Sequence, residues 1–304
     1  MEEINDKDGC VTVLQNIKSN VILKQIFSLL NEKKLLIITL HNKYLYKRLN
    51  MGIKDYKAYN QIIIEIFPTL YMEKNYFFNY LLNNKTEYYH VYFNEETKEI
   101  NKKYFTKEDN VTKIKLIIDY EIKSLKDLFN RCDCIKKIKF IKFNRKNITD
   151  MSRTFSGCYS LKEIDLTNFN TNKVTNMSHM FHACSFLKKL NLFNFNTNNV
   201  TDMSNMFTLC SSLKELNLSN FNTNNVTNMN KMFSGCSSLI KLNINNFDIN
   251  NVINFDYMFE KCSSMKELNI PNNFVYKENM FTDCNDEFKK NIKYEIKGIN
   301  CTII

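Results

Sequence analysis

The chain of 304 residues has no tryptophan, and it has only 5 glycines, 2 prolines and 4 histidines. So few glycines and prolines argue against long flexible linkers and against a sandwich rich in turns. The longest apolar runs, such as Leu35–Leu40, are far shorter than the roughly 18 residues that a membrane span needs. The acidic, polar N-terminus lacks the apolar core of a secretory signal. These absences predict a soluble, cytoplasmic protein without a membrane span.

The sequence also offers little for catalysis. No glycine-rich phosphate loop, Ser/His/Asp set or carboxylate pair stands out. The 10 cysteines are expected to be thiols, because the cytosol is reducing. The donors His179, His182 and Cys184 occur together in one segment only, and we interpret the histidines as surface residues because a structural metal site needs four ligands. The sequence therefore predicts no enzyme, no cofactor and no metal site.

The chain is organised instead by a repeat of 26 residues, in which a cysteine recurs at a fixed step and a phenylalanine precedes it by three positions. Such a period is typical of a stacked array, in which equivalent residues form columns. Small thiols beside apolar positions are expected to be buried. The predicted core ladder comprises Cys158, Cys184, Cys210, Cys236, Cys262, Phe155, Phe181, Phe207, Phe233 and Phe259.

Each repeat begins with a pattern that predicts a short strand. In the copy from Leu213 to Phe221, Leu216 and Leu218 are two positions apart. Both are therefore expected to point into the coil, while Glu215 and Asn217 point outward.

The rest of each repeat predicts a turn and then a helical turn. The asparagine-rich stretch 222–225 has the residues of a turn, because asparagine tolerates left-handed geometry. Val226, Met229, Met232 and Phe233 follow at spacings of about three or four, which predicts one short helical turn packed on the same core.

The combined motif, Phe-x-x-Cys-Ser-Ser-Leu-x-x-Leu-x-Leu with Asn-Val-Thr-x-Met-x-x-Met-Phe, resembles the BspA-like leucine-rich repeat family. It is most similar to the 26-residue branch described in mycoplasma lipoproteins and surface proteins, and the resemblance covers about half the chain. It implies an α/β repeat fold, a right-handed leucine-rich-repeat-like solenoid, here with an N-terminal helical module. Members are often surface proteins that bind host or partner proteins, so an adhesin-like role is one alternative function.

The N-terminal module has two interpretations. The order of apolar positions from Ile22 to Leu49 resembles an F-box-like helical module over residues 14–50. That resemblance implies a substrate adaptor that docks a cullin-type ubiquitin ligase through these helices. The other interpretation is a helical cap whose apolar face covers the first coil of the array.

The predicted organisation has four parts. They are an N-terminal helical module at 1–53, a connecting region of helix and strand at 54–120, the repeat solenoid at 121–284 and a C-terminal cap at 285–304. In the connecting region, Asp55–Leu82 is predicted to be helical with a break at Phe67-Pro68. Strands are predicted within Tyr88–Asp119, with a hairpin turn at Asn94–Thr97.

The formal charge of +10 does not indicate nucleic-acid binding, because between Cys158 and Cys262 eight lysines oppose seven acidic residues. An array that follows phosphates needs its basic residues on the array. The strand position five after each cysteine alternates in charge, and opposite charges on neighbouring strands favour one register. This ladder reads Lys137, Glu163, Lys189, Glu215, Lys241 and Glu267.

The strand face is the predicted binding surface of a non-enzymatic protein-interaction scaffold. Two positions after the ladder lies a mostly uncharged row that is suited to hydrogen bonding a protein. The predicted partner-binding residues are Glu163, Asp165, Lys189, Asn191, Phe193, Glu215, Asn217, Ser219, Lys241, Asn243, Asn245, Glu267 and Asn269.

Overall fold

The computed structural model describes residues 16–19, 22, 42–49, 61–79, 86–119 and 122–298. The chain divides into two compact units, Met1–Gln61 and Ile62–Ile304. Within the described residues, none of the helices combines the length and the apolar character needed to cross a membrane.

Helix α4 (Lys43–Leu49) belongs to the first unit. Asn42 is its N-cap, because the side-chain oxygen Oδ1 accepts hydrogen bonds from the backbone N–H groups of Tyr44 and Leu45, at 3.1 and 3.0 Å. Most of residues 14–50 lie outside the described residues. The F-box-like module and the helical cap therefore both stay predictions.

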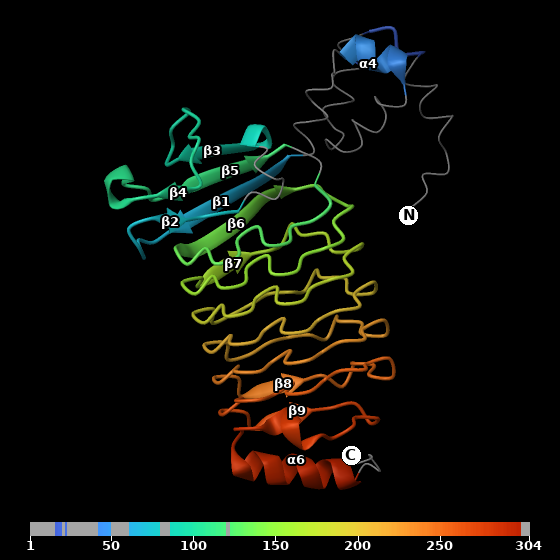
Figure 1. The fold of residues 1–304 in the computed structure, drawn as a ribbon. Coiled ribbons are helices and arrows are strands. Elements are labelled where there is room, and N and C mark those ends of the chain that lie inside the picture. Colours follow the sequence, from blue (N-terminus) through green and yellow to red (C-terminus); the bar gives the residue numbers. More distant parts are fainter. Residues whose placement is uncertain are drawn as a thin grey trace. The chain divides into compact units, whose positions relative to one another are not determined.

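The second unit begins with a five-stranded sheet whose order is β3-β5-β1-β6-β7 (Figure 1). Its strands pair antiparallel except β6 and β7, which are parallel. The strands are β1 (Ile62–Pro68), β3 (Tyr89–Phe93), β5 (Ile114–Ile118), β6 (Ile135–Phe143) and β7 (Glu163–Asp165). A separate two-stranded ribbon pairs β2 (Asn75–Tyr76) with β4 (Tyr104–Phe105), and the 3-10 helices η1 (Thr86–Tyr88) and η2 (Lys107–Asp109) lie in the connections.

The prediction of a helix across Asp55–Leu82 is wrong where the structure describes that stretch. Ile62–Pro68 is the strand β1, and its buried residues Ile62, Ile64 and Ile66 alternate with half-buried ones. A period of two turns one face of a strand toward the core, and neighbours on both sides supply the backbone partners that hold β1 extended. Phe67-Pro68 ends this strand instead of breaking a helix.

The strands predicted within Tyr88–Asp119 are present as β3 and β5, and the predicted turn is present too, since the N–H of Glu96 donates to the carbonyl of Phe93 and that of Ile100 to the carbonyl of Val91. The chain turns at Asn94, where φ is +56°. The partner of β3 is β5, however, which follows only after an excursion through β4 and η2. A turn signal identifies where a strand ends, and it does not identify which later strand pairs with it.

From β6 onward the second unit is a stack of coils, each shifted by 26 residues (Figure 1). Parallel pairing joins Lys137–Lys139 to Glu163–Asp165, and at the far end it joins β8 (Lys241–Asn243) to β9 (Glu267–Asn269). A second line of contacts runs through single parallel bridges from Ser124 to Asn254, one per coil. The coils are therefore in register along the stack.

The predicted helical turn of each repeat is wrong, because that segment is a run of tight turns. The N–H of Met232 donates to the carbonyl of Met229, and Lys231 between them has φ of +54°. The N–H groups of Lys231 and Phe233 donate instead to the next coil, to Asp256 and Met258. An α-helix needs each N–H for the carbonyl four residues earlier, so bonding between coils excludes a helix here.

Both ends of the stack are covered within the second unit. At the first coil, the N–H groups of Thr69 and Asn79 donate to the carbonyls of Cys134 and Leu128, both at 2.7 Å. At the last coil, the 3-10 helix η3 (Glu278–Phe281) leads into α6 (Asp286–Gly298). The ring of Phe288 on α6 meets that of Phe281 edge-on at 5.9 Å.

Candidate functional site

The strand side of the stack carries the ladder of alternating charge. Its members form three ion pairs: Lys137 with Glu163, Lys189 with Glu215 at 4.0 Å, and Lys241 with Glu267 at 2.6 Å. The hydrogen bond from Lys137 lowers the pKa of the Glu163 carboxyl below its ordinary value. Each pair joins two successive coils, so the ladder neutralises its own charge in pairs.

In the row of Asp and Asn residues two positions after the ladder, the side-chain oxygens already accept hydrogen bonds. Oδ1 of Asn191, Asn217 and Asn243 each accepts a hydrogen bond, at 3.0 Å, from the backbone N–H two residues later. Oδ1 of Asp165 does the same for Thr167, at 3.1 Å. These are Asx turns, which close the bend after each strand. The asparagines therefore shape the coil as well as facing outward.

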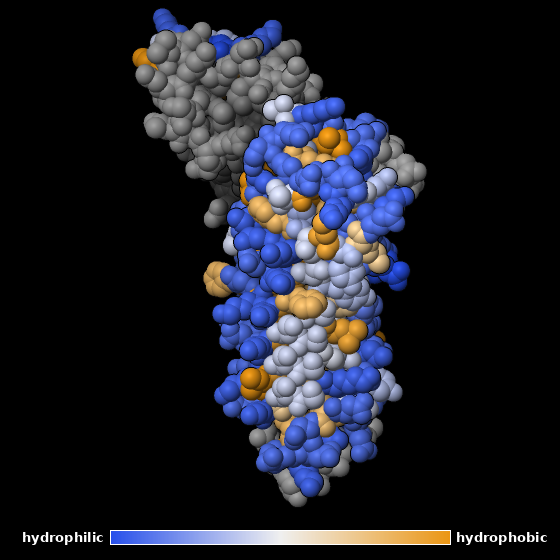
Figure 2. All heavy atoms as spheres, turned by 90° about the vertical axis from the view of Figure 1, so that its left-hand side faces the viewer, coloured by the Kyte–Doolittle hydropathy of each residue, from blue (hydrophilic) through white to orange (hydrophobic). Residues whose placement is uncertain are grey.

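All the residues predicted to bind a partner are exposed. Phe193 is the most exposed large apolar residue among the described ones, at 84%. In the neighbouring coils Thr167 and Ser219 occupy its position, and both are exposed. The structure thus places the whole predicted set at the surface on the strand side, and their role in binding stays a prediction. Along one side of the stack, a column of intermediate hydropathy runs between hydrophilic borders (Figure 2).

Sequence reasoning missed two polar ladders that tie the coils together. The hydroxyls of Thr171, Thr197 and Thr223 are buried, and each exchanges two hydrogen bonds with the backbone of the next coil. The side-chain amides of Asn194 and Asn220 donate to backbone carbonyls of the preceding coil. The signal for them in the sequence is the recurrence of Thr and Asn at one step of 26 residues, which turn chemistry alone also explains.

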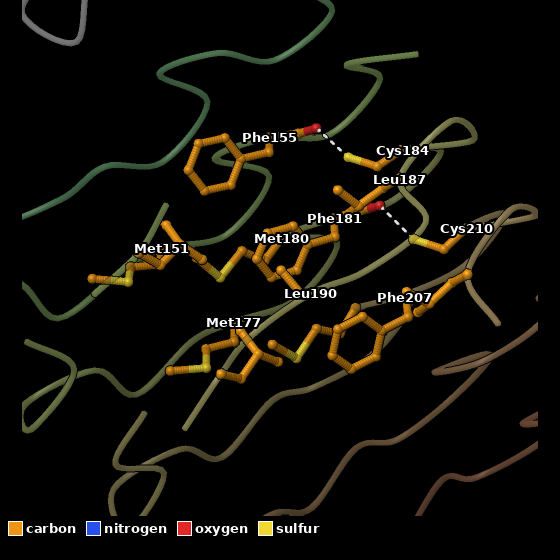
Figure 3. Packing of buried hydrophobic residues seen from close by; sticks show 14 of the residues in the cluster. Met151, Phe155, Met177, Met180, Phe181, Cys184, Leu187, Leu190, Phe207 and Cys210 are labelled. Atoms are coloured by element: carbon orange, nitrogen blue, oxygen red, sulfur yellow. Dashed lines mark hydrogen bonds between the residues drawn. The ribbon is translucent and has the colours of Figure 1, made fainter. Parts of the chain in front are cut away.

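The phenylalanine column is a continuous stack of rings in the core. Phe155, Phe181, Phe207, Phe233 and Phe259 are fully buried. Neighbouring rings are nearly parallel, with centroids 5.5 to 5.9 Å apart. Methionine and leucine side chains fill the space beside the rings (Figure 3). Because each ring contacts both neighbours, the column links the packing of one coil to the next.

The cysteine column lies beside the rings and is made of free, buried thiols. Each thiol donates to the carbonyl of the phenylalanine 29 residues earlier, as Cys184 does to Phe155 and Cys210 does to Phe181, both at 3.2 Å (Figure 3). Burial raises the pKa of the Cys210 thiol to about 12, and it raises the pKa of Cys158, Cys184, Cys236 and Cys262 as well. The thiols are therefore protonated at neutral pH and are poor nucleophiles.

We expect these thiols to be unreactive in the folded protein. In a variant with Cys10→Ser and Cys301→Ser, the remaining thiols should react with an aromatic disulfide reagent at pH 8 at least about 100-fold more slowly than in denaturant, because the thiolate is the reacting form. The measurement is the absorbance of the released thiolate against time. A thiol that reacts at the denatured rate in the folded variant would contradict the burial of this column.

His179 and His182 lie close to each other in one coil. His179 and His182 are half-buried rather than on the surface as predicted, and their rings lie 5.6 Å apart. Burial lowers the pKa of both imidazoles, and the charge of Arg153 lowers that of His179 further. Cys184 donates to a backbone carbonyl in the core. Among the residues that the structure describes, no three His, Cys, Asp or Glu side chains group as a metal site requires.

In-register coils, core columns and an exposed strand side define a stacked repeat protein. The model of a family described as "Mycoplasma protein of unknown function, DUF285" matches residues 98–196, 123–216 and 186–297. These matches span well over half of the chain, and the chain belongs to this family. The resemblance to a mycoplasma repeat family is thereby confirmed, whereas no match supports the F-box resemblance.

Among solved structures, the chain is similar to the crystal structure of the leucine-rich repeat protein of T. pallidum. The two are 16% identical, the TM-score is 0.35, and the alignment covers 59% of this chain and 77% of that one. A comparison with curated proteins found no match.

Proposed function

We propose that the array is a right-handed leucine-rich-repeat-like solenoid and that it works as a non-enzymatic scaffold, binding another protein through its strand side. Stacked repeats commonly use such extended regular surfaces for binding. The proposal assigns no reaction to the chain.

The observation that carries the proposal is the exposure of Phe193 on the strand side. Its side chain is 84% exposed, although the array has room for apolar side chains in its core. Aromatic residues are frequent among those that contribute most to protein interfaces. Polar groups lie nearby on the strand side, among them the ion pair of Lys189 with Glu215 and the Asx turn of Asn191, which suits the rim of an interface.

Affinity capture with the full chain tests this proposal. Phe193→Ala is expected to reduce the amount of captured partner by about tenfold or more, as loss of an interface anchor does. Ile253→Ala is the matched control. Ile253 is 82% exposed, but it lies away from the strands, where its N–H donates to the carbonyl of Thr227 in the preceding coil. Quantitative mass spectrometry of the captured proteins is the measurement.

Equal capture by the Phe193→Ala variant and the wild type would overturn the strand side as the binding surface. Loss of capture with Ile253→Ala alone would place the interface on another side of the coils. Circular dichroism of each variant checks that the fold is unchanged.

A further inference from the structure

A column of lysines lies immediately beside the charge ladder on the strand side. The residue before each ladder position is lysine in every coil but one, where it is Ile240. The five lysines are Lys136, Lys162, Lys188, Lys214 and Lys266, and all are exposed. Within the described ranges, none of them takes part in an ion pair. Neighbouring coils are about 4.8 Å apart, so the ammonium groups repel one another and the column costs stability.

The acidic groups on the same side do not balance this charge. Glu163, Glu215 and Glu267 are paired with the lysines of the ladder itself. Oδ1 of Asp165 accepts hydrogen bonds from both the N–H and the hydroxyl of Thr167, at 3.1 and 2.7 Å. The near neutrality of the whole array therefore conceals an unbalanced positive column on one side.

The uncommitted polar groups of this surface are donors. Oδ1 of Asn191, Asn217 and Asn243 is used inside the Asx turns, which leaves the outward Nδ2 amides to donate. In the part of the chain that the structure describes, these amides have no hydrogen-bond acceptor. Ammonium groups on one column and amides on another thus face solvent together, and both can donate to acceptor atoms of a partner.

We propose that the strand side binds an extended acidic segment of a protein, whose Asp and Glu carboxylates accept hydrogen bonds from the lysine column and the asparagine amides. This inference rests on the proposed function and names the chemistry of its partner. Charge-assisted bonds of this kind are stronger than bonds between neutral groups. They would also relieve the repulsion along the column.

The interspersed glutamates favour a protein over a nucleic acid. Glu215 and Glu267 are exposed beside the lysines, and a continuous phosphate backbone would bring negative charge against them. Surfaces that bind single strands combine a basic groove with a series of aromatic platforms. Here Phe193 is flanked at its own position by Thr167 and Ser219. A peptide can set its carboxylates opposite the lysines and its neutral residues opposite the glutamates and Phe193.

The test uses the full chain and a fluorescent peptide of about 20 residues in which glutamate alternates with serine, measured by anisotropy at low and physiological salt. The triple variant Lys162→Gln, Lys188→Gln, Lys214→Gln should bind the peptide about tenfold more weakly or worse. The control is Lys123→Gln, Lys126→Gln, Lys173→Gln. It removes the same charge from exposed lysines away from the strands and should change affinity less than about twofold.

Binding that weakens with salt and depends on the strand-side lysines supports the proposal. It is overturned if the peptide with glutamine in place of glutamate binds equally well, or if both triple variants lose affinity equally. Tighter binding of an oligothymidylate of the same charge would overturn it in favour of a nucleic acid. If peptide binding is absent while Phe193→Ala still weakens partner capture, this inference fails and the proposed function stands.

Discussion

Replacement of Phe207 by alanine is expected to lower the free energy of unfolding by about 3–5 kcal/mol, the range seen when a buried phenylalanine is truncated. The ring is fully buried and stacks between Phe181, at 5.9 Å, and Phe233, at 5.7 Å. Its removal leaves a cavity between two coils, because the backbone hydrogen bonds between coils hold their spacing fixed. Urea unfolding followed by circular dichroism measures the change.

Phe193→Ala is the matched control for that measurement. The same side chain is lost from an exposed position, so we expect a change within about 0.5 kcal/mol. The Phe207→Ala variant should also unfold less cooperatively, because each coil is stabilised chiefly by its neighbours. A loss below about 1 kcal/mol with an unchanged transition would contradict the central role of the ring column.

The second large effect is expected from Thr197→Val, a substitution that keeps the shape of the side chain. The hydroxyl of Thr197 donates to the carbonyl of Asn222 at 2.7 Å and accepts from the N–H of the same residue at 2.8 Å. Valine leaves both backbone groups without their partner at the edge of the core. Because each unsatisfied group costs about 1–3 kcal/mol, we expect a total loss of about 2–4 kcal/mol.

Thr201→Val in the same coil is the matched control, because it makes the same substitution without removing a buried hydrogen bond. Thr201 is exposed, and its hydroxyl makes one bond, to the carbonyl of Thr175 at 3.2 Å. Water replaces that bond, so the variant should lose less than about 0.5 kcal/mol. Equal urea midpoints for the two variants would show that the buried threonines are not needed to join the coils.

The columns of the stack could be predicted because they depend on the period alone. Once Cys184 and Cys210 lie 26 residues apart in equivalent surroundings, stacking makes them neighbours whatever the detailed path of the coil. The same holds for the pairing of Lys241 with Glu267. A regular period constrains which residues meet, and the alternating residue pattern along Tyr89–Phe93 similarly predicts the strand that the structure shows.

The path between the columns could not be predicted from spacing. Met229, Met232 and Phe233 are spaced as on a helix, yet the N–H groups of Met229 and Phe233 donate to the next coil. Only the presence of neighbouring coils makes this choice favourable. In the same way, pairing with β5 and β6 on its two sides holds β1 extended. Local patterns carry no information about such distant backbone partners.

The candidate surface was predicted in position but not in chemistry. The sequence predicts only that Asn217 belongs to a row suited to hydrogen bonding a protein. The structure shows that its oxygen closes the turn at Ser219. Similarly, counting charges over the whole array concealed the lysine column, since a count does not record on which side of the coil each charge lies.

The covering of the two ends has a consequence for how copies of this chain meet. A coil-on-coil interface is head-to-tail, and a head-to-tail contact repeats without limit when both of its faces are open. In this unit the backbone of the first coil is engaged by Thr69 and Asn79, and α6 follows the last coil. Within the described residues, both terminal faces of the stack are thus covered by other segments of the same chain. The same contacts that let one coil recognise the next are thereby confined to a single chain, which protects it from growing into filaments.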